Sequence, residues 1–243
     1  MYRRAFFFLT GIFSKSAHDL LDLLESGINL AISIDEKEGV RVMSEHYYSK
    51  KTTTSSEEKT WNFELLGHVF TFTTDNAVFS KKEVDFGSRF LIDTFQEPGV
   101  QGDILDLGCG YGPIGLSLAK AHEDRHVFMV DVNERALGLA EKNAADNEVV
   151  NITIQESDRL QGIVDQKFAA ILTNPPIRAG KQVVHTMFEE AKEALLDEGE
   201  LWVVIQKKQG APSAKQKLED LFGNAEVVDK HKGYYILRAK KFD

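Results

Sequence analysis

Three glycines at alternate positions, Gly108, Gly110 and Gly112, follow a short apolar run and precede an apolar helical pattern. This order predicts a buried strand at 103–107, a tight turn and a helix at 112–122. Glycine is needed where the backbone approaches a ligand closely or where φ must be positive. The helix behind such a turn offers free N–H groups and the positive end of its dipole. The stretch therefore predicts a site for a ligand with a nucleoside and a polar tail.

Two aspartates accompany this turn. Asp106 precedes the first glycine by two residues, where its carboxylate would meet a ligand ammonium. Asp131 ends the next apolar run, and in nucleotide-binding βαβ units an acid roughly 20 residues after the glycines accepts from ribose hydroxyls. The alternate glycine spacing differs from the G-x-G-x-x-G pattern, which disfavours an NAD-linked dehydrogenase. A purely structural alternative makes the glycines loop punctuation and Asp131 a strand cap.

A family resemblance rests on three segments: Asp-Leu-Gly-Cys-Gly-Tyr-Gly at 106–112, Asp131, and Thr-Asn-Pro-Pro-Ile at 173–177. Together they resemble class I S-adenosylmethionine (SAM) dependent methyltransferases. Their order is similar to that of the RsmC-like enzymes, which methylate guanine N2 in small-subunit (16S) ribosomal RNA. The similarity runs from about Met43 to the C-terminus. It implies SAM as the cofactor, ribosomal RNA within the assembled small subunit as the partner, and no metal.

The Asn-Pro-Pro segment suits methyl transfer to a planar nitrogen. Asn174, Pro175 and Pro176 follow a buried strand, and two prolines make a rigid turn. A guanine amino group is a poor nucleophile because its lone pair is delocalised into the ring. If the Asn174 side-chain oxygen and the Pro175 carbonyl accept its two N–H bonds, the nitrogen can aim its lone pair at the methyl group. Such acceptors also stabilise the charge that develops on nitrogen.

The resemblance assigns further roles around this centre. It implies cofactor contacts at Asp106, Gly108, Cys109, Gly110, Gly112, Asp131, Val132, Ser157, Asp158 and Asn174. It implies substrate contacts at Phe79, Ile177, Arg178 and Lys181. Many relatives carry an aromatic residue where this chain has Ile177, so the target base would lie instead on Phe79 or Tyr111, or against Ile177 itself.

Other functions stay open at this point. A protein glutamine-N5 methyltransferase, acting on release factors or a ribosomal protein, shares Asn-Pro-Pro. Such enzymes carry a helical N-terminal recognition domain, whereas residues 60–73 alternate like strands. A third possibility is a SAM-binding or RNA-binding module without turnover, against which Asp131 and Asn174 argue.

The elements that position these residues follow from the apolar pattern. Strands are expected near 103–107, 126–131, 151–155, 168–173 and 200–206, with helices at 112–122, 133–146, 181–197 and 214–222. A hairpin at 225–239 would close a seven-stranded, mostly parallel Rossmann-like sheet with helices on both faces. A smaller β-hairpin, at 60–65 and 68–73, would precede it, and a helix would follow through Leu91 and Phe95.

Composition sets the remaining limits. The chain of 243 residues fits one domain with an appendage, and its net charge of −9 argues against indiscriminate nucleic-acid binding. The single cysteine, Cys109, fits a reducing compartment, so a cytoplasmic location is expected. Its expected role in the turn is that of a small filler. Four metal ligands at zinc spacing are not found.

The first 42 residues differ from the rest and form an N-terminal extension. They open with Arg3 and Arg4 before an apolar run at 5–13, which mimics a short signal peptide, and 18–28 has an amphipathic helical pattern. A cytoplasmic SAM enzyme has no use for secretion, so a start of the working protein at Met43 is the favoured interpretation. Residues 43–98 would then form a hairpin and cap region, and 99–243 the methyltransferase domain.

Overall fold

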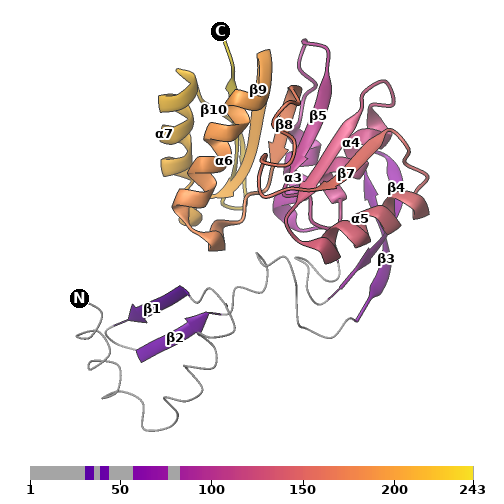
Figure 1. Cartoon of the computed structure of the whole chain (residues 1–243), viewed down its shortest axis with the longest axis horizontal. Coiled ribbons are helices and arrows are strands. Elements are labelled where there is room, and N and C mark those ends of the chain that lie inside the picture. Colours follow the sequence, from indigo (N-terminus) through magenta and orange to yellow (C-terminus); the bar gives the residue numbers. More distant parts are fainter. Residues whose placement is uncertain (1–30, 36–38, 44–56, 76–82, 243) are drawn as a thin grey trace. The chain divides into compact units, whose positions relative to one another are not determined.

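The computed structural model describes residues 31–35, 39–43, 57–75 and 83–242 (Figure 1). The chain divides into two units, Met1–His46 and Tyr47–Asp243. In the first unit, β1 (Ala31–Asp35) pairs antiparallel with β2 (Gly39–Met43), a hairpin that the sequence pattern did not lead us to expect. The predicted helix at 18–28 and the leader-like run at 5–13 lie outside the described residues.

The second unit is built on a seven-stranded sheet whose strand order is β10-β11-β9-β8-β5-β6-β7. Five strands are parallel: β5 (Asp103–Leu107), β6 (Val127–Asp131), β7 (Ile152–Glu156), β8 (Phe168–Thr173) and β9 (Leu195–Gln206). The antiparallel hairpin of β10 (Glu226–His231) and β11 (Tyr234–Lys240) closes the edge beside β9. The predicted fold class is confirmed.

Five helices cover the two faces of this sheet. They are α3 (Phe86–Thr94), α4 (Pro113–Ala121), α5 (Glu134–Asp146), α6 (Lys181–Ala194) and α7 (Ala211–Phe222). Two short 3-10 turns, η1 (Ile177–Ala179) and η2 (Lys207–Gln209), follow β8 and β9. Helices α6 and α7 lie together on one face, and α3, α4 and α5 lie on the other (Figure 1).

Alternation along the strands separates the core into two layers. Ile104 packs with α3, α4 and α5, whereas its neighbour Leu105 packs with α6 and α7. Successive side chains of a strand point to opposite faces, and both faces here are covered. The strands therefore read as continuous apolar runs, which is what a parallel sheet buried on both sides requires.

The hairpin of β3 (Lys59–Leu65) and β4 (His68–Thr74) packs against α5 through two asparagines. Asn143 Oδ1 accepts from the Thr73 backbone N–H at 2.7 Å, and Asn147 Oδ1 accepts from Thr71 N–H at 2.7 Å. The Asn143 amide also donates to the Tyr111 carbonyl at 2.9 Å. These two asparagines therefore supply hydrogen-bond partners for backbone groups at the open edge of the hairpin. Asn143 also links the hairpin to the glycine turn through the Tyr111 carbonyl.

Three predicted boundaries were wrong. Helix α6 ends at Ala194 rather than at 197, because Leu195 turns to the extended conformation and pairs with Phe168 of β8. Strand β9 consequently begins before 200 and contains an irregularity, where Glu198 has a φ of 62°. Helix α7 begins at Ala211 rather than 214, since a proline in its first turn is compatible with a helix start. No helix in the described ranges has the length and apolarity needed to cross a membrane.

Candidate active site

Two adjoining pockets open where the parallel strands end. The first, the Asp131 pocket, is lined by Leu107, Gly108, Val130, Asp131, Val132, Ser157, Asp158, Arg159, Asn174, Pro176 and Met187. The second, the Tyr234 pocket, has a volume of about 220 Å³ and is lined by Asp85, Ser88, Gly108, Cys109, Gly110, Tyr111, Pro113, Ile114, Asn174, Pro175, Pro176, Ile177, Arg178, Gln206, Gln209 and Tyr234. Gly108, Asn174 and Pro176 belong to both, so they stand at the junction.

The glycine turn adopts the conformation that its spacing predicted. Gly108, Gly110 and Gly112 have φ values of 82°, 58° and 97°, which L-residues with a side chain rarely adopt. A Cβ on Gly108 or Gly110 would point into open space, whereas a Cβ on Gly112 would lie 2.9 Å from Cε of Met129. The first two glycines thus leave the backbone accessible to a ligand. Gly112 lines neither pocket and instead allows α4 to pack on the sheet.

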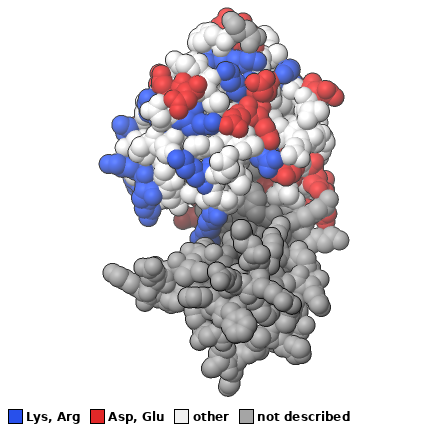
Figure 2. Space-filling view, turned by 60° about the vertical axis from the view of Figure 1, so that its left-hand side comes forward, with Lys and Arg blue, Asp and Glu red and all other residues white. Residues whose placement is uncertain are grey.

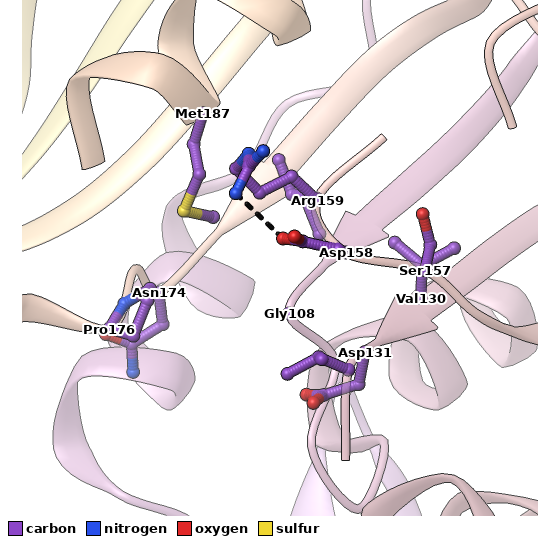
Figure 3. A pocket seen from close by; sticks show the side chains of 11 residues that line it. Gly108, Val130, Asp131, Ser157, Asp158, Arg159, Asn174, Pro176 and Met187 are labelled. Atoms are coloured by element: carbon purple, nitrogen blue, oxygen red, sulfur yellow. Dashed lines mark hydrogen bonds and ion pairs between the residues drawn. The ribbon is translucent and has the colours of Figure 1, made fainter. Parts of the chain in front are cut away.

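Asp131 lies at the end of β6 with its carboxylate held by the glycine turn. Its Oδ2 accepts from Gly110 N–H at 2.9 Å, and its Oδ1 accepts from Asn133 N–H at 2.9 Å. Burial raises the pKa of Asp131, and backbone hydrogen bonds from Asn133, Gly110 and Val132 oppose this effect. Figure 3 shows Asp131 across the pocket from Asn174 and Pro176, with Gly108 between them. A carboxylate has about four lone-pair sites, so Asp131 retains capacity to accept from a hydroxyl beyond these backbone hydrogen bonds.

Asp106 is fully buried beneath the turn and lines neither pocket. Its Oδ2 accepts from Gly115 N–H at 2.8 Å, while its Oδ1 is a buried oxygen without a hydrogen-bond partner. Burial raises its pKa to about 7, with the Gly115 N–H opposing and the charge of Asp131 adding to the shift. The uncompensated oxygen makes the region beneath the turn receptive to positive charge.

Asn174 is oriented by the first turn of α3. Its Nδ2 donates to Ser88 Oγ at 3.0 Å and to Asp85 Oδ1 at 3.2 Å. The same Asp85 oxygen caps α3 by accepting from Ser88 N–H at 3.1 Å. Because a carboxylate only accepts hydrogen bonds, the Asn174 nitrogen must face Asp85, and its carbonyl oxygen must face the other way.

The two prolines after Asn174 hold the backbone in a fixed turn. The Pro175 carbonyl already accepts from Ile177 N–H at 2.9 Å, and the Pro176 carbonyl accepts from Ala179 N–H at 2.9 Å. A carbonyl oxygen has two lone pairs, so Pro175 retains one for a ligand. The turn is therefore compatible with the acceptor role that the sequence suggested for Pro175.

The loop after β7 forms the far wall of the Asp131 pocket. Ser157 is buried, and its Oγ accepts from Gly162 N–H at 2.9 Å. Asp158 pairs at 2.8 Å with Arg159, whose Nε also meets Glu190 at 3.0 Å (Figure 3). Of the two residues predicted here, Asp158 has the exposed carboxylate, whereas the Ser157 hydroxyl serves the loop. Arg159, with a φ of 54°, was not predicted, and its loop position gives no periodic signal.

The C-terminal hairpin contributes an aromatic side chain to the Tyr234 pocket. Tyr111 also lines this pocket but is only 3% exposed, because its ring packs against Trp61 and Phe72 at centroid distances of 6.3 and 5.6 Å, so it offers little surface to a base. Tyr234 lines the pocket beside Ile177, with its ring 5.3 Å from that of Phe86. Phe79 lies outside the described residues.

The remaining predicted residues divide between rim and exterior. Arg178 is an exposed residue that lines the Tyr234 pocket, whereas Lys181 is exposed and lines neither pocket. Cys109 is buried, and burial raises the pKa of its thiol well above the ordinary value, which fits an inert filler. In the described ranges no group of three or more His, Cys, Asp or Glu residues is arranged to hold a metal ion.

A family model described as the methyltransferase small domain matches residues 69–238. The chain belongs to this methyltransferase family. The match begins within the β3–β4 hairpin. It includes the glycine turn, Asp131 and the Asn-Pro-Pro segment. The family indicates a SAM-dependent methyltransferase, and the matched range contains all the residues that line the two pockets.

Three individual likenesses extend this result. The chain is 61% identical over 200 residues, 82% of its length, to the whole of uncharacterized protein YbxB from Bacillus subtilis (strain 168). It is 29% identical to ribosomal RNA large subunit methyltransferase G of Psychromonas ingrahamii, covering 92% of this chain and 59% of that one. It is also similar to a T. thermophilus 16S rRNA N2 G1207 methyltransferase (RsmC) solved with AdoMet and guanosine. There the TM-score is 0.69 with 25% identity, covering 88% of this chain and 58% of the other.

The residues present fit SAM as the cofactor. The methyltransferase small domain and the AdoMet-bound neighbour indicate it, and the site agrees on three independent points. The open space at Gly108 and Gly110 accommodates a close ligand, Asp131 presents acceptors at the rim, and the Asp106 oxygen lacks a partner. SAM supplies a methyl group activated by a sulfonium. Burial raises the pKa values of Asp106 and Asp131 because it disfavours their charged forms. A positively charged ligand beside the turn would favour those charged forms.

Proposed function

We propose that this methyltransferase transfers a methyl group to the exocyclic N2 of a guanine in ribosomal RNA, with 16S RNA of the small subunit as the substrate. Its place of action would be the cytoplasm, where ribosomal particles are assembled. The orientation of Asn174 carries the proposal, because both recorded hydrogen bonds of its side chain fix the nitrogen and leave the oxygen for a substrate amine. The chain's similarity to the T. thermophilus 16S rRNA methyltransferase and to the P. ingrahamii ribosomal RNA large subunit methyltransferase G supports a ribosomal RNA target.

The chemistry follows from the acceptors at the junction. The Asn174 oxygen and the free lone pair of the Pro175 carbonyl would accept the two N–H bonds of guanine N2. These bonds hold the nitrogen in one orientation and stabilise the positive charge it gains, at positions already fixed by α3 and by the proline turn. An exocyclic amine that has gained a methyl group is acidic enough to lose its proton to water. Orientation and proximity therefore suffice without a strong general base.

The guanine ring also needs a surface on which to lie, and Tyr234 would supply it. The residue after Asn-Pro-Pro is Ile177, which lacks a ring, but Tyr234 lines the same pocket from the start of β11. Stacking of a base on an aromatic side chain contributes about 1–3 kcal/mol. An unpaired or flipped guanine would thus lie against Tyr234 with its amino edge toward Asn174.

Tyr234→Ala is expected to lower kcat/KM for RNA by roughly five- to a hundredfold, because the stacking surface of about 1–3 kcal/mol is lost. Tyr234→Phe keeps the ring and should stay near the wild-type value. Methyl-transfer rates at varied RNA concentration measure the effect, and SAM affinity serves as the control for folding. Equal rates for the alanine variant and the wild type would exclude Tyr234 from the base site.

The substrate is tested by offering radiolabelled SAM to small subunits, large subunits, naked 16S and 23S RNA, and release factors in parallel. The proposal expects label in small-subunit RNA, mapped by mass spectrometry to N2 of one guanine. Label in 23S RNA would retain guanine-N2 chemistry and correct the subunit. Label on a glutamine of a release factor would replace the proposal by the protein methyltransferase alternative. SAM binding without transfer to any of them would favour the non-catalytic module.

A chain beginning at Met43 is expected to retain the melting temperature and the transfer rate of the full chain. The reason is that Tyr47–Asp243 forms its own compact unit, which contains both pockets and all strands of the main sheet. Calorimetry and the labelled-SAM assay check this. A lower melting temperature together with lost transfer would assign residues 1–42 to the working enzyme.

A further inference from the structure

A hollow with a high density of lysines lies beside the Tyr234 pocket. It is lined by Gln206, Lys207, Lys208, Pro212, Lys232 and Gly233, with a volume of about 550 Å³, and we call it the lysine hollow. Gln206 lines both the hollow and the Tyr234 pocket, so the two are neighbours. No Asp or Glu is among the described residues that line the hollow.

The hollow is held by the backbone. Lys207 and Lys208 belong to η2, at the end of β9, and Lys232 belongs to the turn between β10 and β11. The Lys207 N–H donates to the Gly233 carbonyl at 2.8 Å, which fastens one turn to the other. Lys232 has a φ of 47° in this tight turn, and its Nζ lies 5.0 Å from the centre of the Phe86 ring. The lysines are therefore attached to fixed turns at the active edge of the sheet.

The carboxylates in the described part of the chain do not neutralise these lysines. Five lysines elsewhere on the surface have a glutamate partner: Lys59, Lys142, Lys215, Lys217 and Lys240. Among the described residues, no carboxylate forms an ion pair with Lys207, Lys208 or Lys232. This contrast occurs in a chain whose net charge is −9. Figure 2 shows many Lys and Arg side chains along the left-hand side of the described part, below a group of Asp and Glu at its upper left, with further Asp and Glu at the centre and right.

From this we propose that the lysine hollow binds the phosphate backbone of the RNA strand next to the target guanine. The inference rests on the proposed function, since it takes the Tyr234 pocket as the site of the base. A flipped base remains joined to its neighbours, so its strand must cross the rim of the pocket. An anionic polymer that follows Gln206 out of the pocket meets three unneutralised cations. Phosphate contacts of this kind hold the strand in register without reading its sequence.

The test compares two triple variants that remove equal charge. The hollow variant removes the three lysine charges of the hollow by combining Lys207→Gln, Lys208→Gln and Lys232→Gln. Lys59→Gln, Lys142→Gln and Lys240→Gln together form the control, on surfaces outside the hollow. Fluorescence anisotropy with a labelled 20-nucleotide single-stranded RNA measures affinity between about 50 and 200 mM salt. Each lost contact to a single strand lowers the salt slope by about 0.7, so the wild type should lose about 20-fold more affinity over this range than the hollow variant.

The kinetic arm uses small subunits and saturating SAM. The hollow variant should show a KM for subunits raised at least tenfold, with kcat and SAM affinity near the wild-type values, whereas the control variant matches the wild type in all three. A hollow variant with the salt slope of the control would overturn the inference while leaving the proposed function standing. If the wild type methylates no RNA but binds it with the hollow-dependent slope, the proposed function fails and the docking surface holds. A wild type that binds no RNA overturns the inference.

Discussion

Replacing Asn174 with alanine is expected to lower kcat by roughly a hundred- to a thousandfold while SAM affinity changes little. The loss of one preorganised hydrogen-bonding group at a reacting centre has effects of this size. The effect should appear in kcat because the hydrogen bond strengthens as the amine gains charge. Stopped-time assays with labelled SAM and subunits measure turnover, and calorimetric titration measures SAM affinity. A variant within a fewfold of wild-type turnover would mean that the Pro175 carbonyl and proximity are sufficient.

The contact with α3 provides a sharper test of the same idea. Asn174→Asp would set a carboxylate against Asp85, where the native amide donates at 3.2 Å, so this variant should also lose most of its turnover. Adding Asp85→Asn returns a donor to the pair and should restore part of the activity. Asparagine caps helices about as well as aspartate, so α3 should keep its start. A double-mutant cycle without coupling between the two positions would show that Asp85 does not orient Asn174.

Replacing Asp131 with alanine is expected to weaken SAM binding by roughly tenfold to a hundredfold. A charged acceptor for two ribose hydroxyls contributes about 1.5–3 kcal/mol, and alanine also releases the amides of Gly110 and Asn133. The SAM affinity of Asp131→Asn should fall between those of the wild type and Asp131→Ala, since asparagine keeps an acceptor and loses the charge. Calorimetric titration checks each value.

A control for the Asp131 result comes from the same pocket. Asp158 also lines it, but its side chain is 58% exposed and already pairs with Arg159. Asp158→Ala should therefore change SAM affinity less than Asp131→Ala does. NAD should show no saturable binding to the wild type or to the Asp158→Ala variant. Equal SAM affinity of the wild type and Asp131→Ala would remove this residue from the cofactor site.

The sheet was predictable because burial on both faces leaves a strong local signal. Apolar runs such as 103–107 and 168–173 marked the strands, and the three glycines marked the turn at its correct place. The end of α6 was harder to predict, because Leu195, Leu196 and their neighbours are compatible with a helix as well as with a strand. Leu195 is extended because it pairs with Phe168 of β8, and a local sequence pattern does not reveal such a tertiary contact.

The active site was predicted in its local part and missed in its distant part. Asp131 and Asn174 follow directly from strand ends, where parallel sheets place ligands. The partners of Asn174 lie 89 and 86 positions earlier in the chain, so no spacing rule could reveal the contact. Tyr234, Gln206 and Gln209 share no motif, and only the pairing of β9 with β11 brings them to one edge.

The contribution of Gly112 and Asp106 also depended on packing. Gly112 belongs to the glycine motif, yet it makes room for Met129 rather than for a ligand. Asp106, for which a contact with a ligand ammonium was expected, lies buried with one oxygen on the Gly115 amide and the other without a hydrogen-bond partner. Neither the burial of a carboxylate nor its rise in pKa is visible in a single sequence, because both depend on what covers the residue.

Asn174 stands at the end of β8, the middle strand of the order β10-β11-β9-β8-β5-β6-β7. On one side, β5, β6 and β7 lead into the glycine turn, Asp131 and the Asp158 loop; on the other, β9 and the β10–β11 hairpin lead into Gln206, Lys232 and Tyr234. The pockets of the two halves share Gly108, Asn174 and Pro176. Under the proposed function, exchanging the terminal hairpin turn would change the target while the methyl-donor pocket is inherited intact. Residues 231–234 would then be the place at which evolution or design begins to retarget such an enzyme.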